Sequence, residues 1–199
     1  MIVLGIDLAG SEKRNTGICV FNDKLEAKCF VVRKDIEILE LVEKFKPKLI
    51  AIDAPLSLPK NRKSLERKEK VHLRECDKQL LDLGIKFFPI TLGPMRMLTK
   101  RGIRLRKILE KRGHKVIEVY PGATQDILKI PRKNVSLKKL MEGLKNLGIK
   151  IEEKNLTHDE LDAITAAYTG YLYLEGKCLQ LGNQKEGTII IPNVDCLKK

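Results

Sequence analysis

The chain has 199 residues, 43% of them hydrophobic, and a formal net charge of +13. This size and hydrophobic fraction suffice for one domain with a real core, and no apolar run approaches the ~18 residues that a membrane-spanning helix requires. Because the first residues also lack the basic leader and cleavage site of a signal peptide, we expect a single soluble, cytoplasmic domain over residues 1–199, with no membrane partner.

The positive charge is concentrated in two segments, 60–78 and 100–115. Such an excess is typical of proteins that bind polyanions, so nucleic acid is a candidate partner. The alternative is that these segments are solvated helix faces of a protein from a thermophile. The abundance of Lys, Glu and Ile suggests such a source. The five cysteines contain no CxxC pair, and with three isolated histidines they complete no zinc site.

The first part of the chain predicts strands and one helix. Continuous apolar runs that end in an acid are typical of central strands buried on both faces, and β-rich runs separated by a short polar turn predict a hairpin. Apolar residues at helical spacing predict a helix that stops before a proline. These elements are a buried strand at 2–8, a hairpin of 16–22 and 25–32, a helix at 35–46 and a second buried strand at 48–59.

Residues 60–98 interrupt this rhythm and are interpreted as a helical insertion rather than an independent domain. The remainder alternates basic or amphipathic helical patterns with apolar runs and ends in a predicted hairpin that contains the apolar strand GTIIIP. The predicted elements are helices at 64–83 and 99–112, a strand at 115–121, helices at 122–129, 136–147 and 158–174, and the hairpin from 178 onward.

This order predicts an α/β fold. The expected core is a mixed five-stranded sheet, with its first three strands antiparallel and then βαβ units, and with helices on both faces. Right-handed crossovers place the first and fourth strands side by side and parallel. Their C-terminal ends then meet where open α/β sheets carry their sites.

Two acids end these neighbouring strands, Asp7 in VLGID and Asp53 in LIAID. Aspartate is disfavoured within strands, although each residue alone is also compatible with a strand-end turn. Parallel strands lie ~4.8 Å apart, so the two carboxylates should converge, and a cation would offset their repulsion. Glu118 in VIEVYP is a similar acid in the next strand, and it is equally compatible with an outward-facing position.

The segment HDELDAITAAY carries two more acids on a helix that is otherwise small or apolar. Thr157 and Glu160 match a capping box, so Asp159 lies in the first turn, where the helix dipole alone favours an acid. Asp162 lies beyond that turn and has no such local advantage. The residues that follow on the same side of the helix are small, which lets the helix approach the sheet closely. They are Ala163, Ala166 and Gly170.

With these residues assembled, the chain resembles the ribonuclease H-like superfamily, and within it an uncharacterised family of predicted RNase H-like nucleases. The patterns that carry the resemblance span almost the whole chain, and the last is also similar to the acidic helix of RuvC-type Holliday-junction resolvases. They are GIDLAGS, IDAPLSLP, RECDKQL, EVYPGA and HDELDAITAAYTG.

The resemblance implies a ribonuclease H-like sheet and two-metal hydrolysis of phosphodiester bonds with Mg²⁺ or Mn²⁺. Asp7 would bridge two metal ions, Asp53 would be the fourth-strand acid, and Asp162 and Asp159 the helix acids. The superfamily commonly has glutamate in the fourth strand, so the shorter Asp53 is a departure. Glu118 lies in a motif of the close family but on a strand that ribonuclease H-like enzymes do not generally use.

The same resemblance implies nucleic acid as the partner, with DNA and RNA both open. Arg74 in RECDKQL and Ser11 in GIDLAGS are the candidate substrate-binding residues. His158 and His114 are further acid/base candidates, with surface histidine as the alternative for each.

Two other functions remain open. A nucleic-acid-binding module with a degenerate site has the same charge and fold but no cleavage. The actin and sugar-kinase class shares this type of sheet, and there Asp7 would serve Mg-ATP while Ser11 and Thr16 contact the phosphates. Such enzymes normally clamp a nucleotide between two domains, whereas 199 residues supply one.

Overall fold

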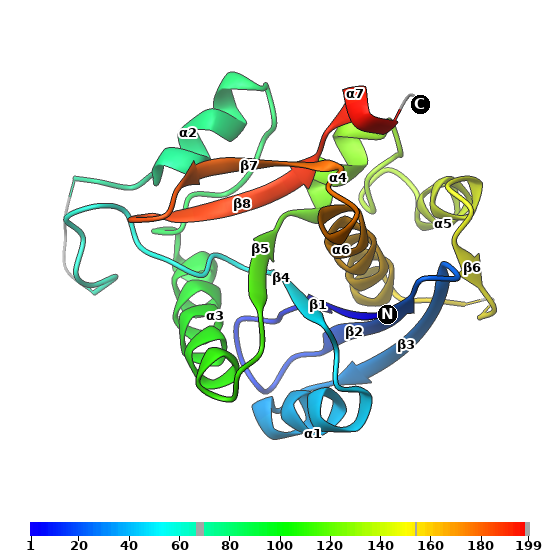
Figure 1. Cartoon of the computed structure of the whole chain (residues 1–199). Helices are drawn as coiled ribbons and strands as arrows, with labels where there is room; N and C mark the ends of the chain where they lie inside the picture. Colours follow the sequence, from blue (N-terminus) through cyan, green and yellow to red (C-terminus); the bar gives the residue numbers. More distant parts are fainter. Residues whose placement is uncertain (67–69, 154, 198–199) are drawn as a thin grey trace.

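The computed structural model describes residues 1–66, 70–153 and 155–197, and it shows an eight-stranded mixed sheet with helices on both faces (Figure 1). The sheet order is β6-β3-β2-β1-β4-β5-β8-β7. The strands are β1 (Ile2–Asp7), β2 (Thr16–Asn22), β3 (Glu26–Val32), β4 (Leu49–Asp53), β5 (Val116–Val119), β6 (Lys150–Ile151), β7 (Cys178–Asn183) and β8 (Gly187–Pro192). The helices are α1 (Asp35–Phe45), α2 (Glu75–Asp82), α3 (Gly93–Lys111), α4 (Pro121–Ile127), α5 (Leu137–Asn146), α6 (His158–Leu174) and α7 (Val194–Leu197).

The predicted fold class is confirmed, with an antiparallel β1-β2-β3 meander and with β4 and β5 added in parallel beyond β1. The predicted count of five strands was wrong. The C-terminal hairpin joins the sheet because β8 pairs in parallel with β5, and the short β6 extends the other edge beside β3. The isoleucines of β8 are buried in the sheet, which explains why so apolar a run does not form a separate hairpin.

Two predicted helix boundaries were also wrong. The helix predicted at 64–83 begins only at Glu75, after Arg74 as N-cap, and residues 67–69 of that prediction lie outside the described residues. The helix predicted at 99–112 begins at Gly93, because Pro94 is tolerated in a first turn, where its missing N–H has no helical partner. The assignment of 60–98 as an insertion in a single domain stays a prediction.

Two apolar layers enclose the sheet. One face of β1, β2 and β4 packs against α1 and α3 in a cluster that includes Leu4, Ile38 and Leu105. The other face packs against α6, which contacts all three of these strands. The long helix α6 therefore lies directly over the centre of the sheet (Figure 1).

Glycines in the strands allow the backbone of α6 to lie unusually close to the sheet. A Cβ atom on Gly5 of β1 would overlap the carbonyl oxygen of Ala163 and the backbone nitrogen of Ala167, and one on Gly17 of β2 would overlap the carbonyl of Asp159. Gly170 does the same from the helix side, since a Cβ there would lie 2.8 Å from Val3. The close approach predicted from the small residues of α6 is thus present, and it sets the depth at which the helix acids lie.

We expect Gly5→Ala to destabilise the protein by about 1–3 kcal/mol or more, because the added methyl group has no space unless α6 shifts away from β1. The matched control is Gly93→Ala at the start of α3, where the new Cβ meets no atom within 4 Å and alanine favours a helix. Urea unfolding of both variants measures the difference. Equal midpoints would contradict the close packing of α6 on β1.

Candidate active site

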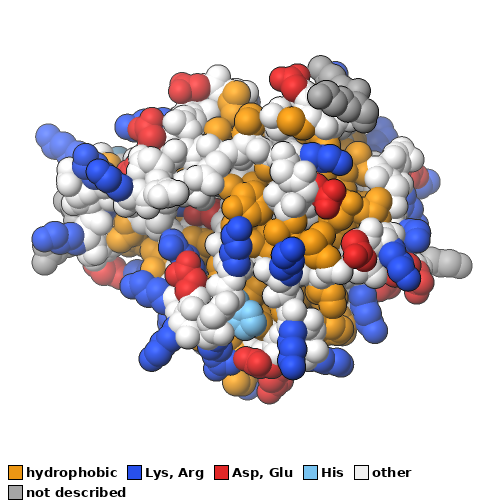
Figure 2. All heavy atoms as spheres, viewed as in Figure 1, with side chains coloured by type: hydrophobic (Ala, Val, Ile, Leu, Met, Phe, Trp, Pro, Cys, Tyr) orange, Lys and Arg blue, Asp and Glu red, His pale blue; other side chains and the backbone are white. Residues whose placement is uncertain are grey.

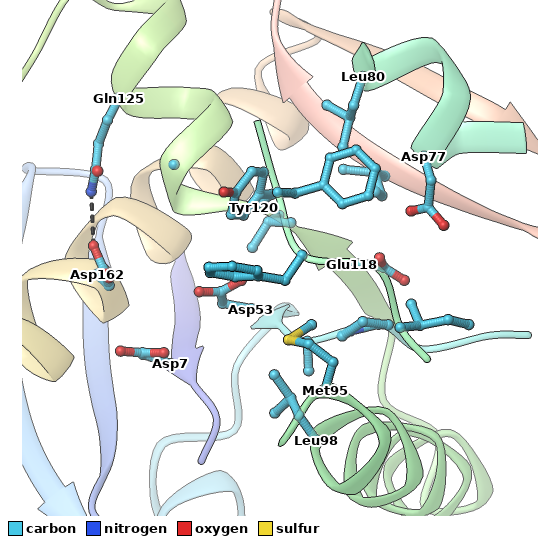
Figure 3. A pocket seen from close by; sticks show the side chains of 18 of the residues that line it. Asp7, Asp53, Asp77, Leu80, Met95, Leu98, Glu118, Tyr120, Gln125 and Asp162 are labelled. Atoms are coloured by element: carbon cyan, nitrogen blue, oxygen red, sulfur yellow. Dashed lines mark hydrogen bonds between the residues drawn. The ribbon is translucent and has the colours of Figure 1, made fainter. Parts of the chain in front are cut away.

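Asp7 and Asp53 lie side by side at the C-terminal ends of β1 and β4. The two strands are parallel, and their register pairs Asp7 directly with Asp53. Both side chains line the same cavity, together with Asp162 from α6 (Figure 3). The convergence expected from strand adjacency is therefore observed, at the edge of the sheet where parallel strands end.

Asp162 is 4% exposed and enters this group from the opposite side. Gln125 of α4 donates a hydrogen bond from Nε2 to Asp162 Oδ1 at 2.8 Å. Lys133, in the connection between α4 and α5, places Nζ 2.6 Å from Asp162 Oδ2 and 4.0 Å from Asp7 Oδ2. Its ammonium group thus partly offsets the charge of two acids that come from different elements.

Asp7 has the most unusual environment of these acids. Its Oδ2 is buried and accepts no hydrogen bond from any described residue. Burial raises the pKa of Asp7 to about 8, with Lys133 acting in the opposite direction and the carboxylates of Asp162 and Asp159 adding to the rise. Burial, reinforced by Asp7 and Asp162, also raises the pKa of Asp53 well above its usual range. These carboxyls therefore resist ionisation until a cation compensates them.

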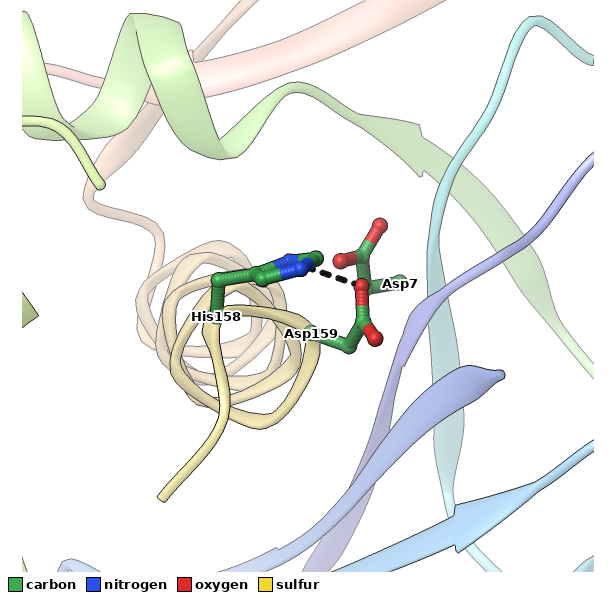
Figure 4. Close-up of side chains that lie close together, drawn as sticks. All are labelled: Asp7, His158 and Asp159. Atoms are coloured by element: carbon green, nitrogen blue, oxygen red, sulfur yellow. Dashed lines mark ion pairs between the residues drawn. The ribbon is translucent and has the colours of Figure 1, made fainter. Parts of the chain in front are cut away.

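Asp159 and His158 form a second grouping with Asp7 at the start of α6 (Figure 4). The Nδ1 atom of His158 lies 2.9 Å from Asp159 Oδ1, and each of the three residues offers one ligand atom within 4.8 Å of the others. The predicted capping box of Thr157 and Glu160 is confirmed, and Asp159 lies in the first turn of α6 without taking part in it. Neither Asp53 nor Asp162 belongs to this tight trio.

The donor set fits a hard divalent cation. Carboxylate oxygens dominate, and Mg²⁺ and Mn²⁺ prefer oxygen ligands, whereas the single imidazole nitrogen, from His158, suits these ions less well. Asp7 Oδ2 supports the fit because it accepts no hydrogen bond, and a buried carboxylate oxygen without a donor is unfavourable unless a ligand satisfies it. Asp7 is shared by both groupings, so it is the residue that could contact ions on either side.

Glu118 and Arg74 lie together, apart from the trio. Glu118 of β5 is 6% exposed and Arg74 is 1% exposed, and the guanidinium donates two hydrogen bonds of 2.7 Å to the Glu118 carboxylate. Arg74 also donates to Asp77, while Leu56 N donates to Glu118 Oε2 at 2.7 Å. Burial raises the pKa of Glu118 although Arg74 opposes the shift. This ion pair joins the start of α2 to the sheet, and its charged atoms are already engaged with each other.

Ser11 lies in a different place, a basic hollow of about 300 Å³ beside the first half of α3. Lys100, Arg101 and Arg104 line the same hollow. His114 follows the C-terminal end of α3. The structure therefore brings Asp7, Asp53, Asp159 and Asp162 to one region, with His158, and leaves Ser11 and His114 outside it.

Three residues that the sequence did not single out organise this region: Lys133, Gln125 and Arg101. Arg101 is 4% exposed and donates to Asp35, to the carbonyl oxygens of Ala9 and Arg33, and to the Thr16 hydroxyl. It therefore fixes the loop that follows β1. One lysine or arginine among the 39 of the chain carries no distinguishing pattern, whereas Gln125 is a polar residue on an apolar face and could have been noticed.

A family comparison matches residues 5–187 to the family described as "Protein of unknown function (DUF429)". The chain belongs to the DUF429 family. This confirms the resemblance to an uncharacterised family that the motifs predicted. No curated protein matches the chain.

A solved structure of similar fold supports the fold assignment. Thermus thermophilus RuvC in complex with a Holliday junction substrate is similar with a TM-score of 0.54 and 16% identity, over 88% of this chain and 96% of that chain. A second structure of RuvC from the same organism gives a TM-score of 0.48 and 15% identity, over 88% and 97% of the two chains. The DUF429 chain thus has the ribonuclease H-like fold that its motifs implied. Among the described residues, no helix has the length and apolar character to cross a membrane.

We expect Mn²⁺ to raise the thermal stability of the DUF429 chain, and Lys133→Ala to enlarge this increase. The ammonium group lies 2.6 Å from Asp162, where it would compete with a divalent ion for the same carboxylate. Its removal should also lower stability without metal, since the acids then repel each other unopposed. Lys139→Ala, an exposed lysine of α5, is the matched control. A metal response equal to that of the control would contradict the competition.

Proposed function

We propose that the protein is a nuclease that hydrolyses phosphodiester bonds of nucleic acid with Mg²⁺ or Mn²⁺, by a two-metal mechanism. The observation that carries the proposal is the buried Asp7 carboxylate, which has an oxygen without a hydrogen-bond donor and lies among Asp53, Asp159 and Asp162. The net charge of +13 and the fold shared with RuvC, a protein seen bound to a Holliday junction, support it further.

In this proposal Asp7, Asp53 and Asp162 are the metal ligands, and Asp159 adds a ligand from the first turn of α6. Two divalent ions supply the Lewis acidity that activates a water and stabilises the leaving oxygen. Gln125 orients the Asp162 carboxylate through its hydrogen bond of 2.8 Å. His158, beside Asp159, is placed to hold a proton at the edge of the site.

The proposal gives three further residues roles away from the reacting atoms: Arg74, Glu118 and Ser11. The buried pair of Arg74 and Glu118 fixes the wall of the cavity rather than the reacting atoms. Ser11 lies in the basic hollow with Lys100 and Arg104, where a backbone phosphate of the substrate would find positive charge. DNA and RNA both fit such contacts, because they are made to phosphate.

A second candidate is a nucleic-acid-binding module without catalysis. The specific observation in its favour is Lys133, whose ammonium group neutralises Asp162 from within the chain. In such a module the lysine would replace the metal permanently, and the acids would serve only to hold it.

The deciding experiment incubates labelled single strands, duplexes, RNA–DNA hybrids and four-way junctions with Mg²⁺, Mn²⁺ or EDTA. A nuclease cleaves at least one of these substrates with metal and none with EDTA. Asp53→Asn should remove the cleavage, while Asp82→Asn, an exposed acid at the end of α2, should retain it and so excludes a contaminant. Binding of a substrate without cleavage under every metal condition would favour the module and overturn the nuclease.

A further inference from the structure

Asp7, Asp53 and Asp162 line only part of a larger cavity of about 450 Å³. Part of its remaining wall is built from aromatic and apolar side chains, beside the buried charged residues Arg74, Asp77 and Glu118 (Figure 3). Met95 and Leu98 contribute from α3, and Leu80 and Tyr120 contribute from α2 and from the end of β5. Nothing in two-metal hydrolysis requires such a wall, so its composition points to a flat, uncharged group held beside the reacting atoms.

Tyr120 is fixed as part of this wall. Its hydroxyl donates to the carbonyl of Lys86 at 2.8 Å, and Arg132 donates to that hydroxyl at 3.1 Å while its guanidinium carbon lies 5.6 Å from the ring centroid. Gly122 provides the space, since a Cβ there would lie 2.8 Å from the Tyr120 ring. The EVYPGA motif therefore builds a preorganised aromatic surface.

Phe88 adds a second aromatic ring and is 71% exposed, although it lines the same cavity. A phenylalanine so exposed contributes little to the core, and exposed apolar side chains at the rim of a cavity are typical of binding sites. Phe87 also lines the cavity and packs against the small apolar cluster around Leu80. Several aromatic rings in one cavity are the usual partners of stacked nucleobases.

Charge argues for a base that belongs to a strand rather than for a free nucleotide. The cations that line the cavity are Arg74, Arg132 and Lys133, and each is already paired with an acid: Glu118, Asp126 and Asp162, respectively. A free nucleotide, with its full phosphate charge beside Asp7 and Asp53, would be held poorly. Figure 2 shows many Lys and Arg side chains around one face of the molecule, and a strand is long enough to contact surface cations that a free nucleotide does not reach.

We propose that this cavity binds a single nucleobase that is turned out of its strand, stacked against Phe88 and Tyr120, with its phosphate directed toward the acids. The position of the phosphate rests on the proposed nuclease function, whereas the binding of the base does not require cleavage. Phe87, Phe88 and Met95, together with Tyr120, are then the residues that recognise the base.

The test compares the affinity of the protein for a labelled thymidine 12-mer and for a 12-mer of the same backbone with every base removed. Fluorescence anisotropy is measured in EDTA, so that cleavage plays no part. The wild-type protein should bind the thymidine strand about five-fold or more tightly, the preference that one stacked base supplies. Phe88→Ala should remove most of this preference, and Phe88→Trp should restore it.

The matched control is Leu81→Ala, which truncates an apolar side chain of α2 that is 49% exposed and does not line the cavity. It should leave the preference unchanged. Equal affinities of the wild-type protein for the two strands, or a preference that survives Phe88→Ala, would overturn the proposal. Free thymidine monophosphate that binds as tightly as the strand would also overturn it, in favour of a nucleotide site.

The two proposals fail separately. Base-dependent binding without cleavage under any metal condition removes the nuclease and keeps the base pocket. Metal-dependent cleavage with no difference between the two strands keeps the nuclease and removes the base pocket.

Discussion

Asp7→Asn is expected to reduce metal-dependent cleavage by at least about 10–100-fold, the loss that even the outer partners of metal ligands cause. Asp7 is shared by both acidic groupings, and asparagine offers a weaker ligand without charge. The rate is measured on the best substrate at saturating Mn²⁺. A variant that cleaves at the wild-type rate would show that Asp7 is not a ligand of the reacting metal.

The same substitution should raise stability in the absence of metal at pH 8–9. The pKa of Asp7 is about 8 in the folded protein and its ordinary value is 3.8, so the unfolded chain loses this proton first as the pH rises. The free energy of unfolding is therefore highest below the ordinary pKa of Asp7. It falls as the pH rises through the pKa that Asp7 has in the folded protein. Asparagine cannot ionise, so the variant avoids this loss.

Thermal unfolding in EDTA between pH 5 and pH 9 measures this effect. An increase of about 2–4 °C at the alkaline end corresponds to ~1 kcal/mol for a chain of this length. Asp82→Asn, in which an exposed acid is neutralised, is the control and should leave the profile unchanged. Parallel pH profiles of the unfolding temperature for Asp7→Asn and the wild-type protein would contradict a buried Asp7 carboxyl with a raised pKa.

Arg74→Met is expected to destabilise the protein by about 3–5 kcal/mol, the usual result of removing one partner of a buried ion pair. Arg74 is 1% exposed and satisfies two buried acids, Glu118 and Asp77, so methionine leaves both without their cation. Urea unfolding measures the loss. Arg112→Met, which breaks the exposed pair with Glu43, should cost at most ~1 kcal/mol.

A double variant sharpens this prediction. Glu118→Gln in the Arg74→Met background removes one of the two stranded charges, so the double variant should lose less stability than the sum of the single variants. Additive losses would indicate that Arg74 stabilises the fold through packing of its side chain rather than through the ion pair.

The sequence predicted the central acids because their placement follows from local pattern and topology. Asp7 and Asp53 end apolar runs, and parallel neighbours bring strand ends together, so their pairing needed no knowledge of loops. Asp162 could be inferred in the same way, because an acid among small residues needs a partner across a close packing interface. In each case a local anomaly pointed to a long-range contact.

Lys133 and the extent of the sheet could not be inferred in this way. The position of Lys133 depends on the course of an irregular connection, and one more lysine in a basic chain is no anomaly. The C-terminal hairpin was predicted, but its pairing with β5 depends on which sheet edge remains uncovered, a tertiary property that strand patterns do not encode. The engagement of Arg74 with Glu118 likewise depends on how the segment before α2 returns to the sheet.

The order of the strands has a consequence for the timing of synthesis. The acids come from residues 7, 53 and 162, and α6 covers the glycines of β1 and β2 only after its own residues, His158–Leu174, have been synthesised. Until β8 emerges, one edge of β5 has no partner. Contacts this distant in sequence form late, since loop closure must precede them. A growing chain therefore has no assembled acidic site until α6 has been synthesised and docks on the sheet, so any activity of the site would begin only then.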